Sequence, residues 1–315
     1  MARLPGSAYA TESQAPAPEY PPNSASPTPT RPGCRLTKHL STMTPSIIVL
    51  TDFFAVSNRA LSYAGELAEP LGAQLVLLHV QHDALLDPAE HGTYRAHREE
   101  RKAAHQLVQL AEQQPVPAVA EISDAFLPDA IRESVEHHHP LMLVLGRPGT
   151  AYSPSDLVTG ATVDLMRTVH RPLLVVPTVG WGTVPPHRIA VAIDDNPFTI
   201  MQQEDLLHRL QGCLGASLNL LHVAPTNEPE PTPESLLKLA RTAGISSEIP
   251  ATHVHTVHQA ETAAGILQAA HEVKADLLVL IARRRSLFGS LFHRSVTAQV
   301  VAESPLPVLL LPAAE

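Results

Sequence analysis

The second half of this 315-residue chain repeats the first half. In residues 47–80, and again in residues 189–223, an apolar segment ends at an aspartate, Asp52 or Asp194, and a later apolar segment closes on Leu-His-Val. Two copies of so long a period indicate duplicated globular domains rather than a solenoid. Each repeat, of about 130 residues, is long enough to enclose a core of its own.

Apolar segments alternate with amphipathic ones from Ser46 onward. The run 47–51 is short and continuous, which is typical of a strand covered on both faces. Apolar residues then recur at helical spacing through 60–71, and Gly72 ends this predicted helix. The same reasoning predicts strands over 74–80, 116–122, 141–145, 173–176, 188–193, 217–223, 251–257, 276–281 and 307–311. It predicts a charged helix within the polar stretch of about 90–114, and helices over 127–138, 155–169, 199–214, 233–243, 260–272 and 290–303. Alternating strands and helices predict an α/β fold with parallel sheets.

We predict four segments along the chain. Residues 1–45 are rich in Pro, Ser, Thr and Ala, and have too few large apolar side chains to offset the entropy of ordering, so we expect disorder there. The first domain is expected over 46–178, a linker rich in Gly and Pro over 179–187, and the second domain over 188–315. Met43 directly precedes the first strand, so one hypothesis is that translation begins there; the intact mass of the native protein tests it.

Charge and hydropathy argue against two classes of partner. The net charge is −9 and no stripe of basic residues exists, which argues against nucleic acid. The run Arg283-Arg284-Arg285 is the exception, and we interpret it as a solvated loop after a strand. No apolar run approaches the length of a membrane span, and the N-terminus lacks the apolar segment of a secretory signal. We therefore expect a cytoplasmic protein with no membrane partner.

Small residues follow the fourth predicted strand of the first half. In open parallel sheets, ligands bind beyond the carboxyl ends of the strands, where the strand order reverses. Gly146-Arg147-Pro148-Gly149 lies at such an end, and Thr159-Gly160-Ala161 opens the next predicted helix. Backbone N–H groups and a helix N-terminus at this place suit an anion such as phosphate. Glycines also serve ordinary turns, so the spacing alone leaves both interpretations open.

The chain resembles the tandem form of the universal stress protein family over about residues 47–312. The resemblance rests on Thr51-Asp52-Phe53 with the small residues after it, on Leu-His-Val, and on the segment from the fourth-strand loop to Pro-Leu-Leu-Val-Val-Pro at 172–177. It implies two Rossmann-like (adenine nucleotide alpha hydrolase-like) α/β domains, each with five parallel strands in the order 3-2-1-4-5. It also implies a role in the stress response, pairing of the two halves through their fifth strands as an internal pseudo-dimer, and a homodimer.

Nucleotide-binding members of this family carry G-xx-G-x9-G-S/T in the loop after the fourth strand. Carried over, the pattern implies that the first half holds ATP or AMP through Asp52, Val80, Gly146, Arg147, Gly149, Thr159, Gly160 and Ala161. Asp52 and Val80 would lie near the adenosine and the others near the phosphates and ribose. Thr159-Gly160 stands where the family has Gly-Ser, which displaces the hydroxyl by one position, and Pro148 removes a donor.

The second half departs further from the family pattern. Ile281 and Arg284 replace the loop glycines, and Arg294-Ser295 stands where Gly-Ser would. We therefore predict no ATP-type pocket in this half, and we interpret Asp194 as a cap or turn acceptor.

Two functional hypotheses follow. In the first, the first half binds ATP or AMP as a regulatory ligand, with at most slow hydrolysis. In the second, neither half binds nucleotide, and the protein acts through protein–protein contacts and dimerisation. No catalytic motif is present, so we assign no catalytic residue and disfavour nucleotidyl transfer.

We assign no metal site beyond the Mg²⁺ that accompanies a nucleotide. Three consecutive histidines, 137–139, would point about 100° apart on a helix and chelate poorly. His79 and His222 occupy the same position in the two repeats, and we interpret them as structural hydrogen-bonding groups.

Overall fold

The computed structural model describes residues 44–52, 55–80, 94–147, 162, 165–180, 182, 184–200, 204–225, 230–245, 249–283 and 295–314. The N-terminal segment predicted to be disordered, 1–45, lies outside these residues except for its last two positions.

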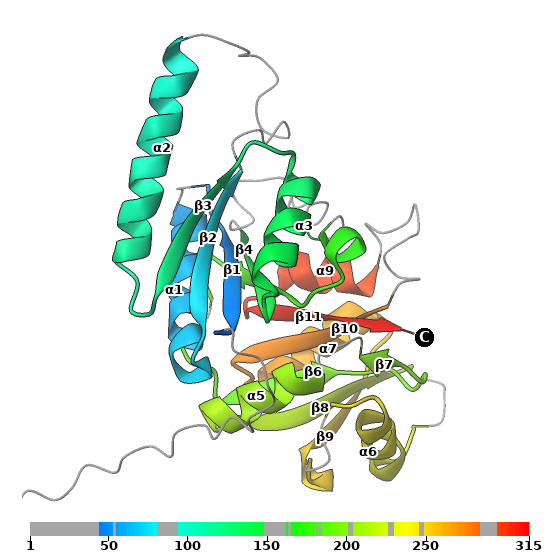
Figure 1. The fold of residues 1–315 in the computed structure, drawn as a ribbon. Coiled ribbons are helices and arrows are strands. Elements are labelled where there is room, and N and C mark those ends of the chain that lie inside the picture. Colours follow the sequence, from blue (N-terminus) through cyan, green and yellow to red (C-terminus); the bar gives the residue numbers. More distant parts are fainter. Residues whose placement is uncertain are drawn as a thin grey trace, which may run out of the picture. The chain divides into compact units, whose positions relative to one another are not determined.

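The first half is a parallel sheet with helices on both faces (Figure 1). Its elements are β1 (Ser46–Leu50), α1 (Ala55–Leu71), β2 (Gln74–Val80), α2 (Tyr94–Glu112), β3 (Ala118–Ser123), α3 (Leu127–His138), β4 (Met142–Arg147) and β5 (Leu173–Pro177). The strands lie in the order β3-β2-β1-β4-β5, and every neighbouring pair is parallel. The expected order 3-2-1-4-5 is therefore confirmed for this half.

The second half repeats this arrangement. Its elements are β6 (Arg188–Ala192), β7 (Thr199–Ile200), α5 (Glu204–Leu214), β8 (Ser217–Ala224), α6 (Pro233–Thr242), the 3₁₀ turn η1 (Ala251–His253), β9 (Val254–His258), α7 (Thr262–Glu272), β10 (Leu277–Arg283), α9 (Val296–Glu303) and β11 (Val308–Ala314). Its parallel strands lie in the order β9-β8-β6-β10-β11, which is again 3-2-1-4-5.

Local sequence signals set several helix ends. Gly72 and Gly215 follow α1 and α5 with φ of 60° and 64°, a left-handed conformation that ends a helix at little cost for glycine. At the start of α9, the Ser295 hydroxyl accepts a hydrogen bond of 3.1 Å from the Ala298 amide. The glycine at the same position in both halves shows that the two repeats share this helix-ending residue as well as their strands.

Two predicted elements begin later than expected. The strand predicted over 251–257 starts with the 3₁₀ turn η1, so that β9 begins at Val254. The helix predicted over 199–214 begins only at Glu204, because Thr199 and Ile200 form the short strand β7, which pairs antiparallel with Ala313 and Ala314 of β11. The physical reason is that β11 continues past the residues that pair with β5. The backbone N–H and C=O groups of this last part need partners, and the extended segment β7 supplies them.

The fifth strands of the two halves pair with each other. β11 runs antiparallel to β5, with Val308 opposite Val175, Leu309 opposite Leu174 and Leu310 opposite Leu173. All six residues are buried, and the pairing joins both halves in one hydrogen-bonded sheet. The expected internal pairing through the fifth strands is thus confirmed.

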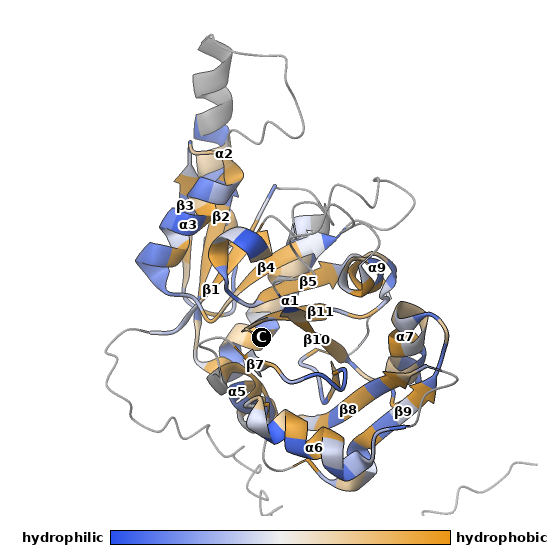
Figure 2. Ribbon diagram, turned by 90° about the vertical axis from the view of Figure 1, so that its right-hand side faces the viewer, coloured by the Kyte–Doolittle hydropathy of each residue, from blue (hydrophilic) through white to orange (hydrophobic). Residues whose placement is uncertain are grey.

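One apolar cluster lies on each face of this sheet. The first packs helices α1, α2, α5 and α6 against the strands, and the second packs α3, α7 and α9 against them. Each cluster contains residues of both halves. Figure 2 shows the strands as predominantly hydrophobic and many helix residues as hydrophilic. Among the helices described, none has the length and apolar character to cross a bilayer.

Candidate functional site

The strand order reverses between β1 and β4 in the first half, and three predicted site residues lie at this place. Asp52 follows β1 by two positions and is exposed, Val80 ends β2 and is 9% exposed, and Gly146 is the penultimate residue of β4. Because β2, β1 and β4 are neighbours and parallel, these residues share one edge of the sheet. That edge is where open α/β sheets bind ligands.

The remaining predicted site residues are described only in part. Gly149, Thr159, Gly160 and Ala161 lie outside the described residues. Thr162, which directly follows them, is 3% exposed, and its hydroxyl has no hydrogen-bond partner among the described residues. A buried hydroxyl without a partner costs free energy, so a ligand oxygen or a water is expected to satisfy it.

Arg147, also predicted to contact nucleotide, reaches toward the second half. Its guanidinium donates hydrogen bonds to the carbonyl oxygens of Ala302 and Ser304 at the end of α9, at 2.6 Å and 2.5 Å. The side chain is buried, and burial lowers the pKa of the guanidinium from its usual value. The end of α9 favours this positive charge, because the C-terminus of a helix carries a partial negative charge. Nucleotide contact by Arg147 stays a prediction.

The two repeats can be aligned through their strand pairs. Gly146 lies opposite Val176 of β5, which directly precedes Pro177. Likewise, Ile281 lies opposite Leu311 of β11, which directly precedes Pro312. Ile281 therefore occupies the place of Gly146, as the sequence alignment expected. By the same register Ala282 occupies the place of Arg147.

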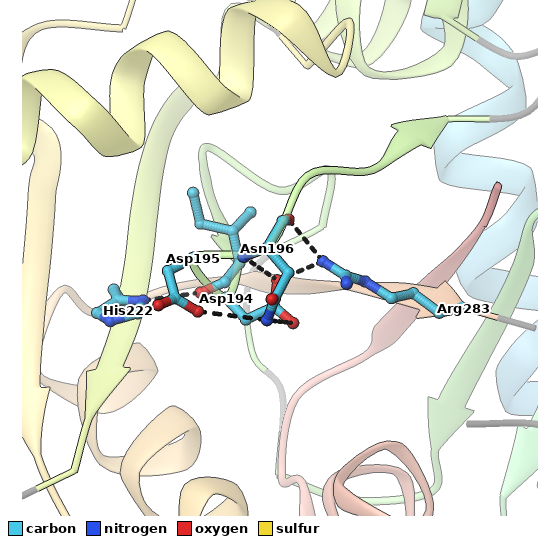
Figure 3. A network of polar contacts seen from close by, with 6 residues as sticks. Asp194, Asp195, Asn196, His222 and Arg283 are labelled. Atoms are coloured by element: carbon cyan, nitrogen blue, oxygen red, sulfur yellow. Dashed lines mark hydrogen bonds and ion pairs between the residues drawn. The ribbon is translucent and has the colours of Figure 1, made fainter. Parts of the chain in front are cut away.

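At the matching edge of the second half, Asp194 is held within a network of its own (Figure 3). Its Oδ1 accepts a hydrogen bond of 3.2 Å from the Asn196 amide, two residues on, and the same oxygen forms an ion pair with Arg283. Arg283 also donates to the Asn196 carbonyl at 2.8 Å and lies over the Phe198 ring, 5.4 Å from its centroid. The interpretation of Asp194 as a turn acceptor is confirmed.

Arg283 itself corrects an expectation. The sequence suggested that the arginine run begins a solvated loop, whereas Arg283 ends β10 and its side chain is only 19% exposed. The physical reason is that β10 and β6 are neighbours, so a cation at the end of one strand meets the carboxylate that follows the other. Arginine and aspartate at the ends of adjacent parallel strands are the signal that would have revealed this pair.

The repeated histidines are structural. His79 Nδ1 lies 2.9 Å from the carbonyl oxygen of Thr51, and His222 Nδ1 lies 3.2 Å from that of Ile193. In both halves, the imidazole of the second strand thus contacts the backbone carbonyl of the residue that precedes the aspartate. This confirms the interpretation of these histidines as hydrogen-bonding groups that shape the loop.

Other histidines engage separate partners. His138 Nε2 lies 2.8 Å from Glu121 Oε2, which also accepts a hydrogen bond of 3.0 Å from the Ser134 hydroxyl. On β9, burial and the neighbouring His253 lower the pKa of His255. Within the described part of the chain, no group of three or more His, Cys, Asp or Glu is placed to hold a metal ion.

Fold and site together define a tandem protein of the Rossmann-like α/β class, with different residues at the matching sheet edge of each repeat. The family model described as "Universal stress protein family" matches the chain twice, over residues 43–177 and 186–312. The chain therefore belongs to the universal stress protein family.

Solved structures share this fold, and a curated relative matches part of the sequence. A universal stress protein from Archaeoglobus fulgidus DSM 4304 superposes with a TM-score of 0.59 at 16% identity, over 85% of this chain and 96% of that one. A functionally unknown protein from Pseudomonas aeruginosa PAO1 gives 0.51 at 17% identity, over 85% and 92%. The "Universal stress protein in QAH/OAS sulfhydrylase 3'region" of Thermus aquaticus is 52% identical over 52 residues, which are 16% of this chain and 38% of the relative.

Proposed function

We propose that this universal stress protein is a cytoplasmic stress-response binding or signalling module whose first half binds ATP or AMP as a regulatory ligand. The second half, in this proposal, binds no nucleotide. One contrast between matching positions carries the proposal: Gly146 places no side chain at the end of β4, whereas Ile281 stands at the matching position of β10.

Each candidate residue of the first half would contribute a distinct contact. Gly146 would let the backbone approach the ligand, since no Cβ intervenes. The Asp52 carboxylate would accept hydrogen bonds from the hydroxyl or amino groups of adenosine. The buried hydroxyl of Thr162 would gain the partner that it lacks among the described residues. Arg147 would contribute through its backbone, because its guanidinium is committed to α9.

The remaining contacts are proposed from the family pattern. Val80, Gly149, Thr159, Gly160 and Ala161 would complete the contacts to adenosine, ribose and phosphates, and Mg²⁺ would accompany the triphosphate. We assign no catalytic residue, and hydrolysis would be slow at most. The halves 46–178 and 188–315, joined by the linker 179–187, would thus share one fold and differ in ligand.

Calorimetric titration of the full chain with ATP and with AMP tests the proposal. Asp52→Asn should weaken binding roughly tenfold, because a hydrogen bond to a carboxylate is worth about 1.5–3 kcal/mol. Asp194→Asn, the matched change in the other repeat, should leave the affinity unchanged. Gly149→Arg, which installs the residue type of the second-half loop, should abolish binding. Equal effects of the two aspartate variants would contradict a site in the first half.

A second function applies if the wild-type protein shows no saturable binding of ATP or AMP and releases no nucleotide when it is denatured. The protein would then act through protein–protein contacts and as a homodimer. Such a dimer would need another surface than the fifth strands, because β5 and β11 already pair within the chain. Sedimentation of the purified full chain measures its oligomeric state directly.

A further inference from the structure

The second half contains a pocket of about 220 Å³ at the carboxyl ends of β6, β8 and β10. Its inner walls are apolar and include Ala192, Leu221, Ile266 and Leu280. Val296, at the start of α9, also lines it and is 37% exposed, which is unusual for a large apolar side chain in this protein. The pocket therefore combines an apolar interior with an apolar residue open to solvent.

The pocket owes its space to one small residue. Ala192 ends β6 and lies opposite Leu221, whereas Leu50 ends β1 and lies opposite Leu78. These registers make Ala192 the counterpart of Leu50, so the second half lacks three side-chain carbon atoms that the first half has at this position. Leu50 is 7% exposed and fills its place in the core. Loss of a buried leucine side chain leaves a cavity when the surroundings do not collapse.

Among the described residues that line the pocket, the two charged side chains, Asp194 and Arg283, form an ion pair with each other. Arg283 pairs with Asp194, donates to the Asn196 carbonyl and lies over Phe198 (Figure 3). Both charged side chains line the pocket, yet together they carry no net charge. Among these described lining residues, an anionic ligand would have to break this ion pair to gain an oppositely charged side chain, and a cationic ligand would meet the same obstacle.

We propose that the second half binds a small, uncharged, mainly apolar molecule in this pocket. A dry cavity of about 150 Å³ with walls of similar composition accommodates benzene, so 220 Å³ suits a bicyclic ring about the size of indole. The hydroxyls of Thr262 and Thr297, which also line the pocket, offer hydrogen bonds to a single polar group of such a ligand. This inference does not depend on nucleotide binding by the first half.

The test uses indole as the neutral probe and indole-3-carboxylate as its anionic analogue, titrated into the full chain and followed by saturation-transfer NMR. Wild-type protein should bind indole saturably and bind the carboxylate at least roughly tenfold more weakly. Ala192→Leu, which restores the residue of the first repeat, should weaken indole binding by a similar factor. Val296→Phe, at the exposed rim, serves as a second blocking variant if the first does not fold, and Val119→Ala, at an exposed position on β3 of the first half, is the control that should leave indole binding unchanged.

Three results would overturn the proposal. The first is no saturable binding of indole by the folded wild-type protein. The second is unchanged binding in the blocking variants, which would place the probe elsewhere. The third is displacement of indole by ATP or tighter binding of the carboxylate, either of which would show a site for anions rather than for neutral apolar molecules.

Discussion

At the scale of single residues, this protein differs between its halves at matching positions. Arg147 shows the effect most clearly, because its counterpart Ala282 has no side chain that reaches the other repeat. The buried guanidinium joins the end of β4 in the first half to the end of α9 in the second half. The contact is charge-assisted and lies at a helix C-terminus, where a cation is favoured.

Arg147→Met should lower the free energy of unfolding by about 2–4 kcal/mol, since it removes two charge-assisted hydrogen bonds to the carbonyl oxygens of Ala302 and Ser304, of which the second is buried. Urea denaturation followed by circular dichroism measures the change. Arg132→Met is the control, because the Arg132–Asp129 pair is exposed and should be worth less than about 0.5 kcal/mol. Equal losses in the two variants would show that the bonds of Arg147 do not stabilise the fold.

At the scale of elements, the sequence predicted most strands and helices and the edge at which the candidate site lies. Residues 127–138 became α3 with both ends as predicted, because that amphipathic segment folds by local preference and its own packing. The strand β7 could not be predicted, since its pairing depends on a strand more than a hundred residues away. The Arg283–Asp194 pair was missed for another reason: the expected order makes β6 and β10 neighbours, but the arginine run was interpreted as a solvated loop.

The junction of β5 and β11 should be a stability hot spot. Leu309→Ala should lower the free energy of unfolding by about 2–5 kcal/mol, because Leu309 is buried at this pairing and truncation leaves a cavity. Val119→Ala, on β3 and 44% exposed, should change it by no more than about 0.5 kcal/mol. Thermal and urea unfolding of both variants provide the comparison, and a small effect at Leu309 would argue that the junction is loosely packed.

At the scale of the whole described fold, the two repeats share one hydrogen-bonded sheet and two apolar clusters. Separate domains on a linker would each have a closed core, and their stabilities would be independent. Here both clusters continue across the junction of β5 and β11, so we expect the free energy of unfolding of one repeat to depend on the other. The duplicated sequence therefore predicts two domains, whereas in the structure the two repeats share their sheet and their apolar clusters, so we expect them to unfold together.

Leu67→Ala tests this coupling from a distance. Leu67 lies in α1 of the first half and is 1% exposed, so truncation should cost about 2–5 kcal/mol. Native-state hydrogen exchange should then show faster exchange at the amides of β8, in the second half, as well as at those of β1. Exchange that accelerates only in the first half would show that the repeats unfold independently.

The pairing of β5 with β11 also has a consequence for biosynthesis. The ribosome releases β5 long before β11, and the apolar run Leu173–Val176 must wait with one side of its backbone uncovered until the later strand arrives. During that interval the nascent polypeptide offers a ready template for another chain. A messenger truncated before β11 would leave this template exposed for good, and such a product would be prone to aggregate although its first repeat is complete.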